Sequence, residues 1–259
     1  MTIGVAKPNA DELNDVEHFF INSHSIHEEV SAGVFERYAL EKAEQIFAAR
    51  PQLVMAGGTG LYIKAFCEGI DQIPGVPAII RDELNRRYEA EGIEWLKAEL
   101  SKSDPLYFAS GEIHNPHRML RALEVKLASG KSIKNYQTNQ KTNRDFKIIK
   151  IGIGVDRQEL YNNINNRVHV MIEQGLLDEV KSLYEFRNLK ALQTVGYAEL
   201  FEYLDGKREL AEAIEEIQKN TRHYSKRQMT WFRKDEAIHW FHPSDYSGIF
   251  DYIRKKMSE

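Results

Sequence analysis

The chain has 259 residues, 42% of them hydrophobic and 29% charged, a composition that excludes disordered and fibrous proteins and allows a sizeable core. The formal net charge of −4 excludes a global basic surface, so any contact with a polyanion has to be local. No apolar run approaches the roughly 20 residues of a membrane span, and the N-terminus lacks a signal segment. We therefore expect a cytoplasmic location and no membrane partner. The single cysteine, Cys67, excludes an internal disulfide.

The first part of the chain predicts an α/β arrangement. Residues 1–33 are rich in loop formers, and apolar residues at helical spacing then predict a helix over 35–50, which Pro51 ends. The short apolar run Leu53–Ala56 precedes another helical pattern and predicts a buried parallel strand. Phe146–Val155 is a second apolar run and predicts a second strand.

Between these predicted strands the pattern is helical, with Pro and Gly at intervals. The fold class predicted is therefore α/β, with a parallel sheet core built from residues 1–71 and 146–259. A helical domain is inserted at 72–145. After Val155 the chain is again mostly helical as far as Trp240, so we expect a helical C-terminal part.

A glycine-rich turn follows the first predicted strand. Gly57, Gly58 and Gly60 permit a tight turn and close backbone approach, while Thr59 offers a hydroxyl at the start of the next helix. The pattern predicts a polar or anionic ligand at this turn. The alternative is a turn that only joins a strand to its crossover helix.

Arg167 lies in a helix that is predicted to begin at Asp156 as N-cap. It borders an apolar stripe that includes Ile164 and Val168. Its guanidinium group could therefore lie at the mouth of a pocket and bind phosphate oxygens. The alternative is an arginine that extends along the core to water or forms half of an ion pair.

A basic segment lies near the C-terminus. Its cations are Lys219, Arg222, Lys226, Arg227, Arg233 and Lys234. Arg222 and Lys226 share a helical face, so they could follow a phosphate backbone, although such a run is often only a solvated helix face. The nine histidines are scattered without the spacing of metal ligands, and no metal site is predicted.

Several motifs occur together in one order. They are IGVAKPN at 3–9, GGTGLYIKAFCEG at 57–69, NPHRMLRALEV at 115–125, ELYNNINNRVHVMIEQGLLDEV at 159–180, ALQTVGYAEL at 191–200 and NTRHYSKRQMTWFRK at 220–234. Over nearly its whole length the chain resembles the tRNA dimethylallyltransferases, also called isopentenyl-tRNA transferases. The resemblance implies a P-loop-type parallel sheet core with an inserted helical bundle. It also implies transfer of a dimethylallyl group from dimethylallyl diphosphate to N6 of the anticodon-loop adenosine that is 3′ of the anticodon.

The same resemblance implies roles for particular residues. Arg167 matches an arginine that contacts the donor diphosphate, and Thr59 would position the flipped-out base. Asn163 stands where relatives often carry another arginine. The residues implied to contact tRNA are Thr59, Arg81, His117, Arg118, Met119, Leu120, Arg121, Arg222, Lys226 and Arg227. The family usually has glutamine where this chain has His117.

One part of the family pattern is missing. Relatives begin with a strand, a GxxxxGK[ST] phosphate loop and a DSxQxY segment, and none of these occurs here. We therefore expect an N-terminally truncated chain whose first strand, phosphate loop and general-base aspartate are absent. The Mg²⁺ and nucleotide (ATP) sites expected of the family would then have their main ligands upstream. The chain as written is expected to be a monomer and to transfer no prenyl group.

Two alternatives remain. A non-catalytic remnant that still binds tRNA would keep the basic segment without the donor site. A small-molecule kinase related through the P-loop fold is disfavoured, because the match continues through tRNA-contacting motifs that such kinases lack.

Overall fold

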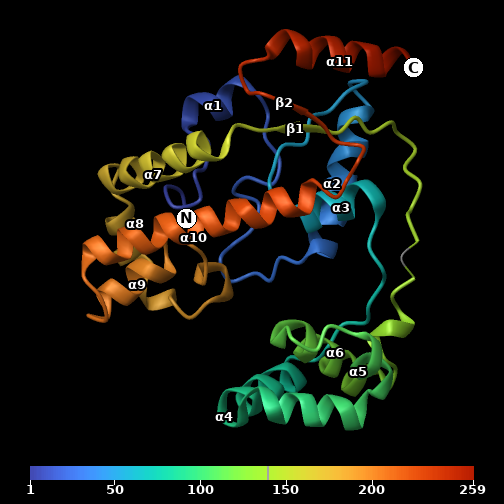
Figure 1. The fold of residues 1–259 in the computed structure, drawn as a ribbon. Helices are drawn as coiled ribbons and strands as arrows, with labels where there is room; N and C mark the ends of the chain where they lie inside the picture. Colours follow the sequence, from blue (N-terminus) through green and yellow to red (C-terminus); the bar gives the residue numbers. More distant parts are fainter. Residues whose placement is uncertain (139) are drawn as a thin grey trace. The chain divides into compact units, whose positions relative to one another are not determined.

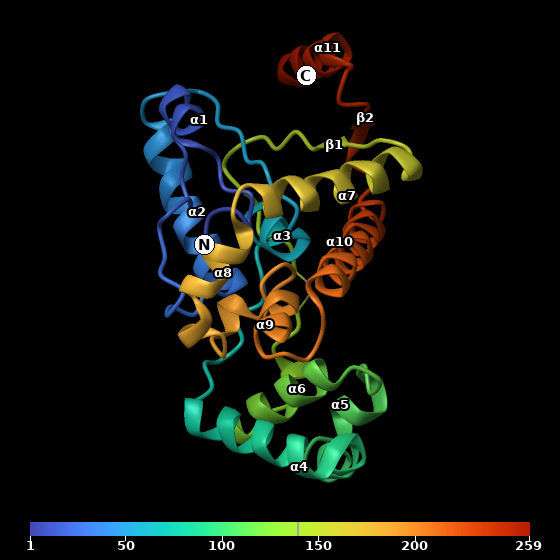
Figure 2. The same ribbon diagram turned by 90° about the vertical axis from the view of Figure 1, so that its left-hand side faces the viewer.

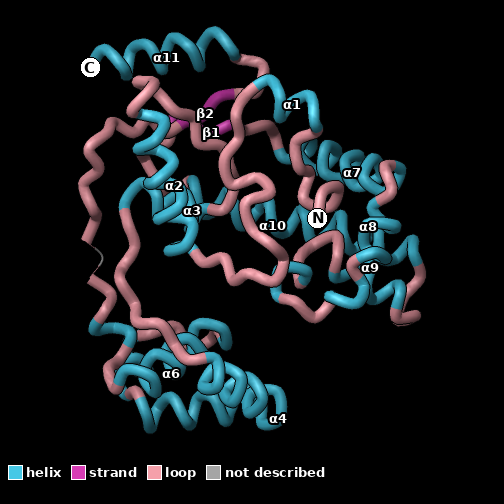
Figure 3. Tube along the Cα trace, turned by 180° about the vertical axis from the view of Figure 1, so that it is seen from behind, coloured by secondary structure: helices cyan, strands magenta, loops and turns pink. Residues whose placement is uncertain are grey.

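The computed structural model describes residues 1–138 and 140–259, and the chain divides into two compact units. Unit 1 consists of residues 1–67 and 144–259, and unit 2 consists of residues 68–143. These boundaries fall a few residues before those predicted for the inserted domain. Helices dominate both units (Figures 1 and 3).

Unit 1 combines a small sheet with helices of very different lengths. The helices are α1 (Ala10–Asp15), α2 (Ala32–Phe47), α3 (Gly60–Glu68), α7 (Arg157–Glu173), α8 (Leu176–Ser182), α9 (Ala198–Leu204), α10 (Leu210–Phe232) and α11 (Tyr246–Ser258), with 3₁₀ turns at Tyr184–Phe186 and Lys190–Leu192. No helix among the described residues is both long enough and apolar enough to cross a membrane.

The sheet of unit 1 has two parallel strands, β1 (Ile151–Ile153) and β2 (His239–Phe241). In both views of the ribbon, α11 lies on one side of the strands, with α7 and α10 on the other (Figures 1 and 2). Gly152 pairs with Trp240, and a Cβ at Gly152 would lie only 2.6 Å from the Trp240 ring. Glycine at this place therefore lets the indole approach the backbone of β1 closely.

The structure corrects the predicted strands. Leu53–Ala56 is not a strand, because no neighbouring strand among the described residues supplies a hydrogen-bond ladder, and Val54 is 93% exposed. Only Ile151–Ile153 of the predicted strand 146–155 is paired. The strand β2 falls in the region that was expected to be helical, and its aromatic residues are good strand formers.

The core of unit 1 lies where α7, α8, α9 and α10 meet. Its buried members are Val168, Leu176, Val180, Leu192, Tyr197, Leu200, Phe201, Ala213 and Ile217. Helix α10 packs against both α7 and α9 and presents Ala213 and Ile217 to them. These apolar residues recur at helical spacing, so burial of one face holds this long helix in place.

The N-terminal segment is attached to this core by Glu179 of α8. Its carboxylate accepts hydrogen bonds from the backbone N–H groups of Thr2 (2.8 Å), Ile3 (2.9 Å) and Gly4 (3.2 Å), and from the hydroxyl of Tyr197. Tyr197 is fully buried, and a Cβ at Gly4 would overlap its ring. The glycine and the carboxylate together allow the segment to lie directly on the tyrosine.

The negative charge of Glu179 is stabilised although the carboxylate is partly buried. Burial opposes ionisation and is the largest effect, but the hydrogen bonds from Tyr197 and the three backbone N–H groups outweigh it, so the pKa of Glu179 is lowered. Burial first, and the bond to Glu179 second, raise the pKa of Tyr197. The tyrosine therefore remains a hydrogen-bond donor and the glutamate an acceptor throughout the neutral range.

Unit 2 is a small helical bundle. It contains α4 (Ala78–Ser103), α5 (Pro105–Ser110), α6 (Pro116–Ser129) and a 3₁₀ turn at Ile133–Asn135. Gly92 interrupts α4 with a φ of 76°, a left-handed conformation that glycine adopts without strain. Asp104 and Asn115 cap α5 and α6, each followed by proline at the first helical position. The helices enclose a core of their own, which includes Leu96, Leu100 and Leu123.

The two chain connections at the boundary of the units are held by hydrogen bonds. Within unit 2, the N–H of Thr142 donates to the carbonyl of Glu68 at 2.8 Å, and the Asp71 carboxylate accepts from the N–H and hydroxyl of Thr138 at 2.9 and 2.6 Å. Within unit 1, the Arg144 guanidinium donates to the carbonyl of Phe66 at 2.8 Å. The chain that leaves α3 therefore lies beside the chain that returns to unit 1.

We predict that Glu179→Gln destabilises unit 1. An amide accepts hydrogen bonds through one oxygen only and carries no charge, so the set of four donors loses bonds worth about 1 to 3 kcal/mol of the free energy of unfolding. Thermal unfolding followed by circular dichroism should show a melting temperature lower by several degrees. Asp178→Asn, which changes the exposed neighbouring residue, is the matched control. Equal melting temperatures for the two variants would contradict the role given to Glu179.

The contribution of Glu179 should also depend on pH. Its pKa in the folded chain lies below the ordinary value of 4.5, so its stabilisation is complete above pH 4.5 and is lost as the pH falls through the folded-state pKa. The difference in unfolding free energy between wild type and Glu179→Gln should therefore shrink on acidification from pH 7. Urea titrations at a series of pH values measure this difference, and a constant difference would refute the prediction.

Candidate functional site

The glycine-rich segment of unit 1, residues 57–60, lies against the C-terminal half of α10. The side-chain amide of Gln228 donates to the carbonyl of Gly58 at 2.9 Å. A Cβ on Gly60 would overlap the Trp231 indole, so the close approach of the chain to α10 requires glycine there. The bond from Gln228 and the packing on Trp231 fix the backbone on both sides of Thr59.

Thr59 lies immediately before α3. Its carbonyl accepts from the N–H groups of Tyr62 and Ile63 at 2.9 and 3.1 Å and so begins the helix. Its side chain is exposed, and no hydrogen bond from its hydroxyl to another described residue is found. The hydroxyl is therefore available to a ligand beside the N-terminus of a nine-residue helix.

Helix α7 carries Arg167. The predicted N-cap is confirmed, since the Asp156 carboxylate accepts from the N–H groups of Gln158 and Glu159. Ile164 and Val168 are buried, whereas Arg167 beside them is exposed and makes no ion pair with a described residue. Its guanidinium is thus accessible to an anion.

The basic residues of α10 differ in how firmly they are held. Arg222 is half-buried, and its guanidinium donates to the Asn165 amide oxygen of α7 at 2.7 Å. Lys226 and Arg227 are exposed, and Arg227 lies over the Tyr224 ring at 5.7 Å. Helix packing of α7 on α10 therefore brings Arg222 to the helix that carries Arg167.

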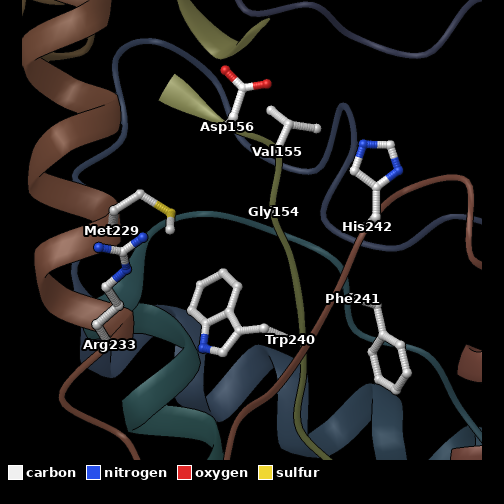
Figure 4. Close-up of a pocket in the computed structure, with 8 residues that line it drawn as sticks. All are labelled: Gly154, Val155, Asp156, Met229, Arg233, Trp240, Phe241 and His242. Carbon is white, nitrogen blue, oxygen red and sulfur yellow. The ribbon is translucent and has the colours of Figure 1, made fainter. Parts of the chain in front are cut away.

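A pocket of about 470 Å³ lies where β1 and β2 end (Figure 4). In Figure 4, Met229 of α10 and Arg233, which directly follows α10, lie on one side of the Trp240 indole, while Phe241 points away from it. Asp156 and His242 complete the polar part of the lining. The carboxyl ends of parallel strands are the usual place for ligands in α/β folds.

Sequence reasoning missed most of this pocket. Trp240 and His242 belong to β2 or follow it, and β2 was not predicted. The available signal was the aromatic triplet His239–Phe241 after the turn at Asp235, in which His239 donates its N–H to the Lys150 carbonyl next to β1. Arg233 was noted only as one of the basic residues.

In unit 2, the tRNA-contacting residues implied by the resemblance separate into surface and core. His117 and Arg118 are exposed in the first turn of α6, and Arg118 is paired with Glu112. The side chains of Met119 and Leu120 are 0% and 6% exposed and belong to the core of unit 2. Residues at these positions of an amphipathic helix face inward, so the two side chains lie in the core, and the assignment of Met119 and Leu120 to tRNA stays a prediction.

Arg81 of α4 and Arg121 of α6 meet at one carboxylate. Glu124 is almost fully buried, and its Oε2 lies 3.2 Å from Arg121 Nη1 and 4.0 Å from Arg81 Nε. Both arginines remain partly exposed. The shared partner places two guanidinium groups side by side on the surface of unit 2.

No group of three or more histidine, cysteine or acidic side chains in the described part of the chain is arranged to hold a metal ion.

Known proteins share this sequence and fold. A family model described as IPP transferase matches residues 1–235. The chain is 45% identical over 254 residues to tRNA dimethylallyltransferase 1 of Bacteroides thetaiotaomicron, which covers 98% of this chain and 82% of the relative. It is 46% identical over 259 residues to the tRNA dimethylallyltransferase of Christiangramia forsetii, which covers 100% and 86%.

Solved structures agree with these matches. The full-length tRNA isopentenylpyrophosphate transferase of Bacillus halodurans superimposes with a TM-score of 0.67 at 33% identity, covering 99% of this chain and 83% of that one. A eukaryotic dimethylallyltransferase acting on tRNA gives a TM-score of 0.73 at 23% identity over 95% of this chain and 64% of that one, which shows the fold alone. The chain belongs to the IPP transferase family, and the predicted family and fold class are confirmed.

We predict that Gly60→Ala displaces the glycine-rich segment, whereas Gly57→Ala is tolerated. The added methyl group at Gly60 overlaps the Trp231 ring, but at Gly57 the nearest atom is 4.0 Å away on Ile63. Gly60→Ala should lower the unfolding free energy by about 1 to 3 kcal/mol, typical of overpacking. Tryptophan fluorescence and thermal unfolding measure both effects, and Trp231→Ala should partly rescue Gly60→Ala. Equal behaviour of the two alanine variants would contradict the packing described.

Proposed function

We propose that this chain serves in the transfer of a dimethylallyl group from dimethylallyl diphosphate to tRNA. The observation that carries the proposal is the 45% identity to a tRNA dimethylallyltransferase over 98% of the chain. In this reaction the exocyclic N6 amine of the adenosine 3′ of the anticodon attacks C1 of the donor, the C1–O bond breaks, and diphosphate leaves. A proton is lost from the amine.

Arg167 is assigned to the leaving diphosphate. Charge develops on the bridging oxygen as the C1–O bond breaks, so a fixed cation there stabilises the transition state more than the bound substrate. Arg167 is exposed and makes no ion pair with a residue that the structure describes. It lies on a helix that is held by its N-cap and by the buried side chains of Ile164 and Val168. These features suit a guanidinium that has to bind phosphate oxygens.

Thr59 is assigned to the acceptor base. An enzyme that works on a base amine has to take the base out of the stack. The exposed Thr59 hydroxyl lies on a backbone fixed by Gln228 and Trp231, so it can hold a base edge in one orientation. The general base that takes the amine proton is not assigned to any residue of this chain.

The cations of α10 are assigned to the phosphate backbone of tRNA. Arg222, Lys226 and Arg227 lie within six consecutive positions, and Arg222 and Lys226 share a face. In unit 2, the exposed side chains of His117 and Arg118 and the pair Arg81 and Arg121 are assigned to further tRNA contacts. These contacts are local, as the net charge of −4 requires.

The finer parts of this proposal rest on the resemblance. They include Mg²⁺ bound with the donor diphosphate, nucleotide (ATP) binding of the P-loop class, a monomeric state and a cytoplasmic location. Mg²⁺ would neutralise charge on the diphosphate. No described residue is assigned to it.

A second function, tRNA binding without transfer, would need the cations alone. The exposed Lys226 and Arg227 of α10 and the partly exposed Arg81 and Arg121 of unit 2 can bind phosphates without a donor site. The two functions therefore share the RNA contacts and differ in the donor site.

One experiment separates them. The purified chain is incubated with tRNA, Mg²⁺ and dimethylallyl diphosphate labelled in the prenyl group, and tRNA binding is measured in parallel. Label in the adenosine 3′ of the anticodon supports transfer by this chain. Binding without label supports the second function, and absence of both rejects the proposal.

We predict that Arg222→Ala, Lys226→Ala and Arg227→Ala each weaken tRNA binding similarly for different tRNA sequences. Each should make the plot of log affinity against log salt concentration shallower by about one unit, because one phosphate contact is lost. Lys255→Ala changes an exposed lysine of α11 and should leave the slope unchanged. The measurement is a salt titration of binding by fluorescence anisotropy. Unchanged slopes for the three α10 variants would remove these residues from the RNA interface.

Arg167→Ala should affect the binding of diphosphate and not the binding of tRNA. We predict that it weakens binding of inorganic diphosphate by roughly 10- to 100-fold, the value of a hydrogen bond between charged groups, and leaves tRNA affinity nearly unchanged. Isothermal titration calorimetry with diphosphate provides the measurement, and Arg254→Ala on α11 is the control. A changed tRNA salt slope with unchanged diphosphate binding would show that Arg167 contacts RNA instead.

A further inference from the structure

A second pocket of unit 1, of about 540 Å³, lies between α7 and α10. Its lining is polar and includes Tyr161 and Asn162 of α7 with Glu215 and Arg222 of α10. A volume of this size accommodates a small organic group. Arg222 also belongs to the row of cations assigned to the tRNA backbone, so the pocket opens beside that row.

The aromatic ring of Tyr161 is held by neighbouring side chains. Arg157 donates to its hydroxyl at 3.1 Å and lies over its ring, with the guanidinium 5.1 Å from the ring centre. The Arg222 guanidinium is 5.9 Å from the ring centre, at the outer limit of a cation–π contact. A flat group can stack on the ring near Arg222 while that arginine binds a phosphate.

Polar groups that can bind the edge of such a flat group lie nearby. The Asn162 amide oxygen accepts from Gln158 at 3.1 Å, which leaves its NH₂ group as a donor towards the pocket. No hydrogen bond or ion pair of the Glu215 carboxylate is found among the described residues, so it is an acceptor. A donor and an acceptor beside an aromatic ring match the edge and the face of a nucleobase.

The charges of the pocket disfavour a phosphate inside it. Glu215 and Glu216 are both acidic, and Lys219 lies 3.0 Å from Glu216, which neutralises it. A carboxylate acceptor prefers an exocyclic amine, which adenine, cytosine and guanine carry and uracil lacks. The phosphate of a bound nucleotide would therefore stay on Arg222 and Lys226, and its base would enter the pocket.

We propose that this pocket binds one nucleobase of tRNA, preferably one with an exocyclic amine, and that this base is not the acceptor adenosine. The inference rests on the proposed function, because it assumes that the α10 cations bind the phosphate backbone of tRNA. Gln228, which holds the glycine-rich segment at Gly58, lies six residues beyond Arg222, or about 9 Å along the helix. The pocket and Thr59 therefore serve different nucleotides.

The test uses an anticodon stem–loop RNA and a set of its variants in which single loop nucleotides are abasic. Binding is measured for the wild-type chain, Tyr161→Ala and Tyr161→Phe, each in a salt titration. Tyr161→Ala should weaken binding about 10-fold through loss of stacking without changing the salt slope, and Tyr161→Phe should bind normally. One abasic position other than the acceptor should weaken binding to wild type but not to Tyr161→Ala.

Further variants keep the test decisive. Glu215→Gln should reduce the preference for an amine-bearing base over uracil at that position. If melting curves show that Tyr161→Ala does not fold, Asn162→Ala takes its place, since Asn162 is exposed. The inference is overturned if no abasic position couples to the pocket variants, or if Tyr161→Ala lowers the salt slope by about one unit as Arg222→Ala does. Failure of the wild-type chain to bind any RNA would reject the proposed function and this inference with it.

Discussion

Helix α10 is the element on which the other functional parts of unit 1 depend. One stripe of it is buried against α7 and α9, and its remaining surface holds the glycine-rich segment through Gln228 and Trp231. Its residues also line both pockets, at the strand ends and beside α7. A shift of this helix would therefore move the Thr59 backbone, the exposed cations of α10 and the pocket walls together.

The interactions that fix the site are mostly between distant parts of the sequence. Arg222 reaches Asn165 of α7, and the N-terminal segment is held by Glu179 of α8. Each contact uses a backbone group or an amide whose pairing does not show in the hydrophobic pattern. Packing of apolar stripes brings the helices together, and these polar contacts then determine which residues face one another.

The sequence predicted the helices better than the strands. The helix at 157–173, with Asp156 as cap, follows directly from its local pattern, and the inserted helical region is also apparent. The strand expected at Leu53–Ala56 is not formed, because a parallel strand depends on its neighbours and not on its own apolar residues. For the same reason β2 was missed, although its three residues complete the sheet.

The candidate site was predicted unevenly. Thr59, Arg167 and the α10 cations were found through motifs and lie exposed or half-exposed, as a binding role requires. Met119 and Leu120 were assigned to tRNA because they belong to the motif at 115–125, and their positions on the helix place their side chains in the core of unit 2. The two pockets could not be inferred, because each is formed by segments that are fifty or more residues apart.

The paired connections between α3 and Arg144 have a consequence for how this protein can change over evolution. The outgoing and returning chains already lie together, joined by the bond from Thr142 to Glu68 and by the Asp71–Thr138 pair. Closing the ends of an inserted segment costs conformational entropy that grows only slowly with its length. Insertions and deletions within the helical bundle therefore need not disturb the folding of the rest, so the surface of unit 2 can diverge while the structure of unit 1 is retained.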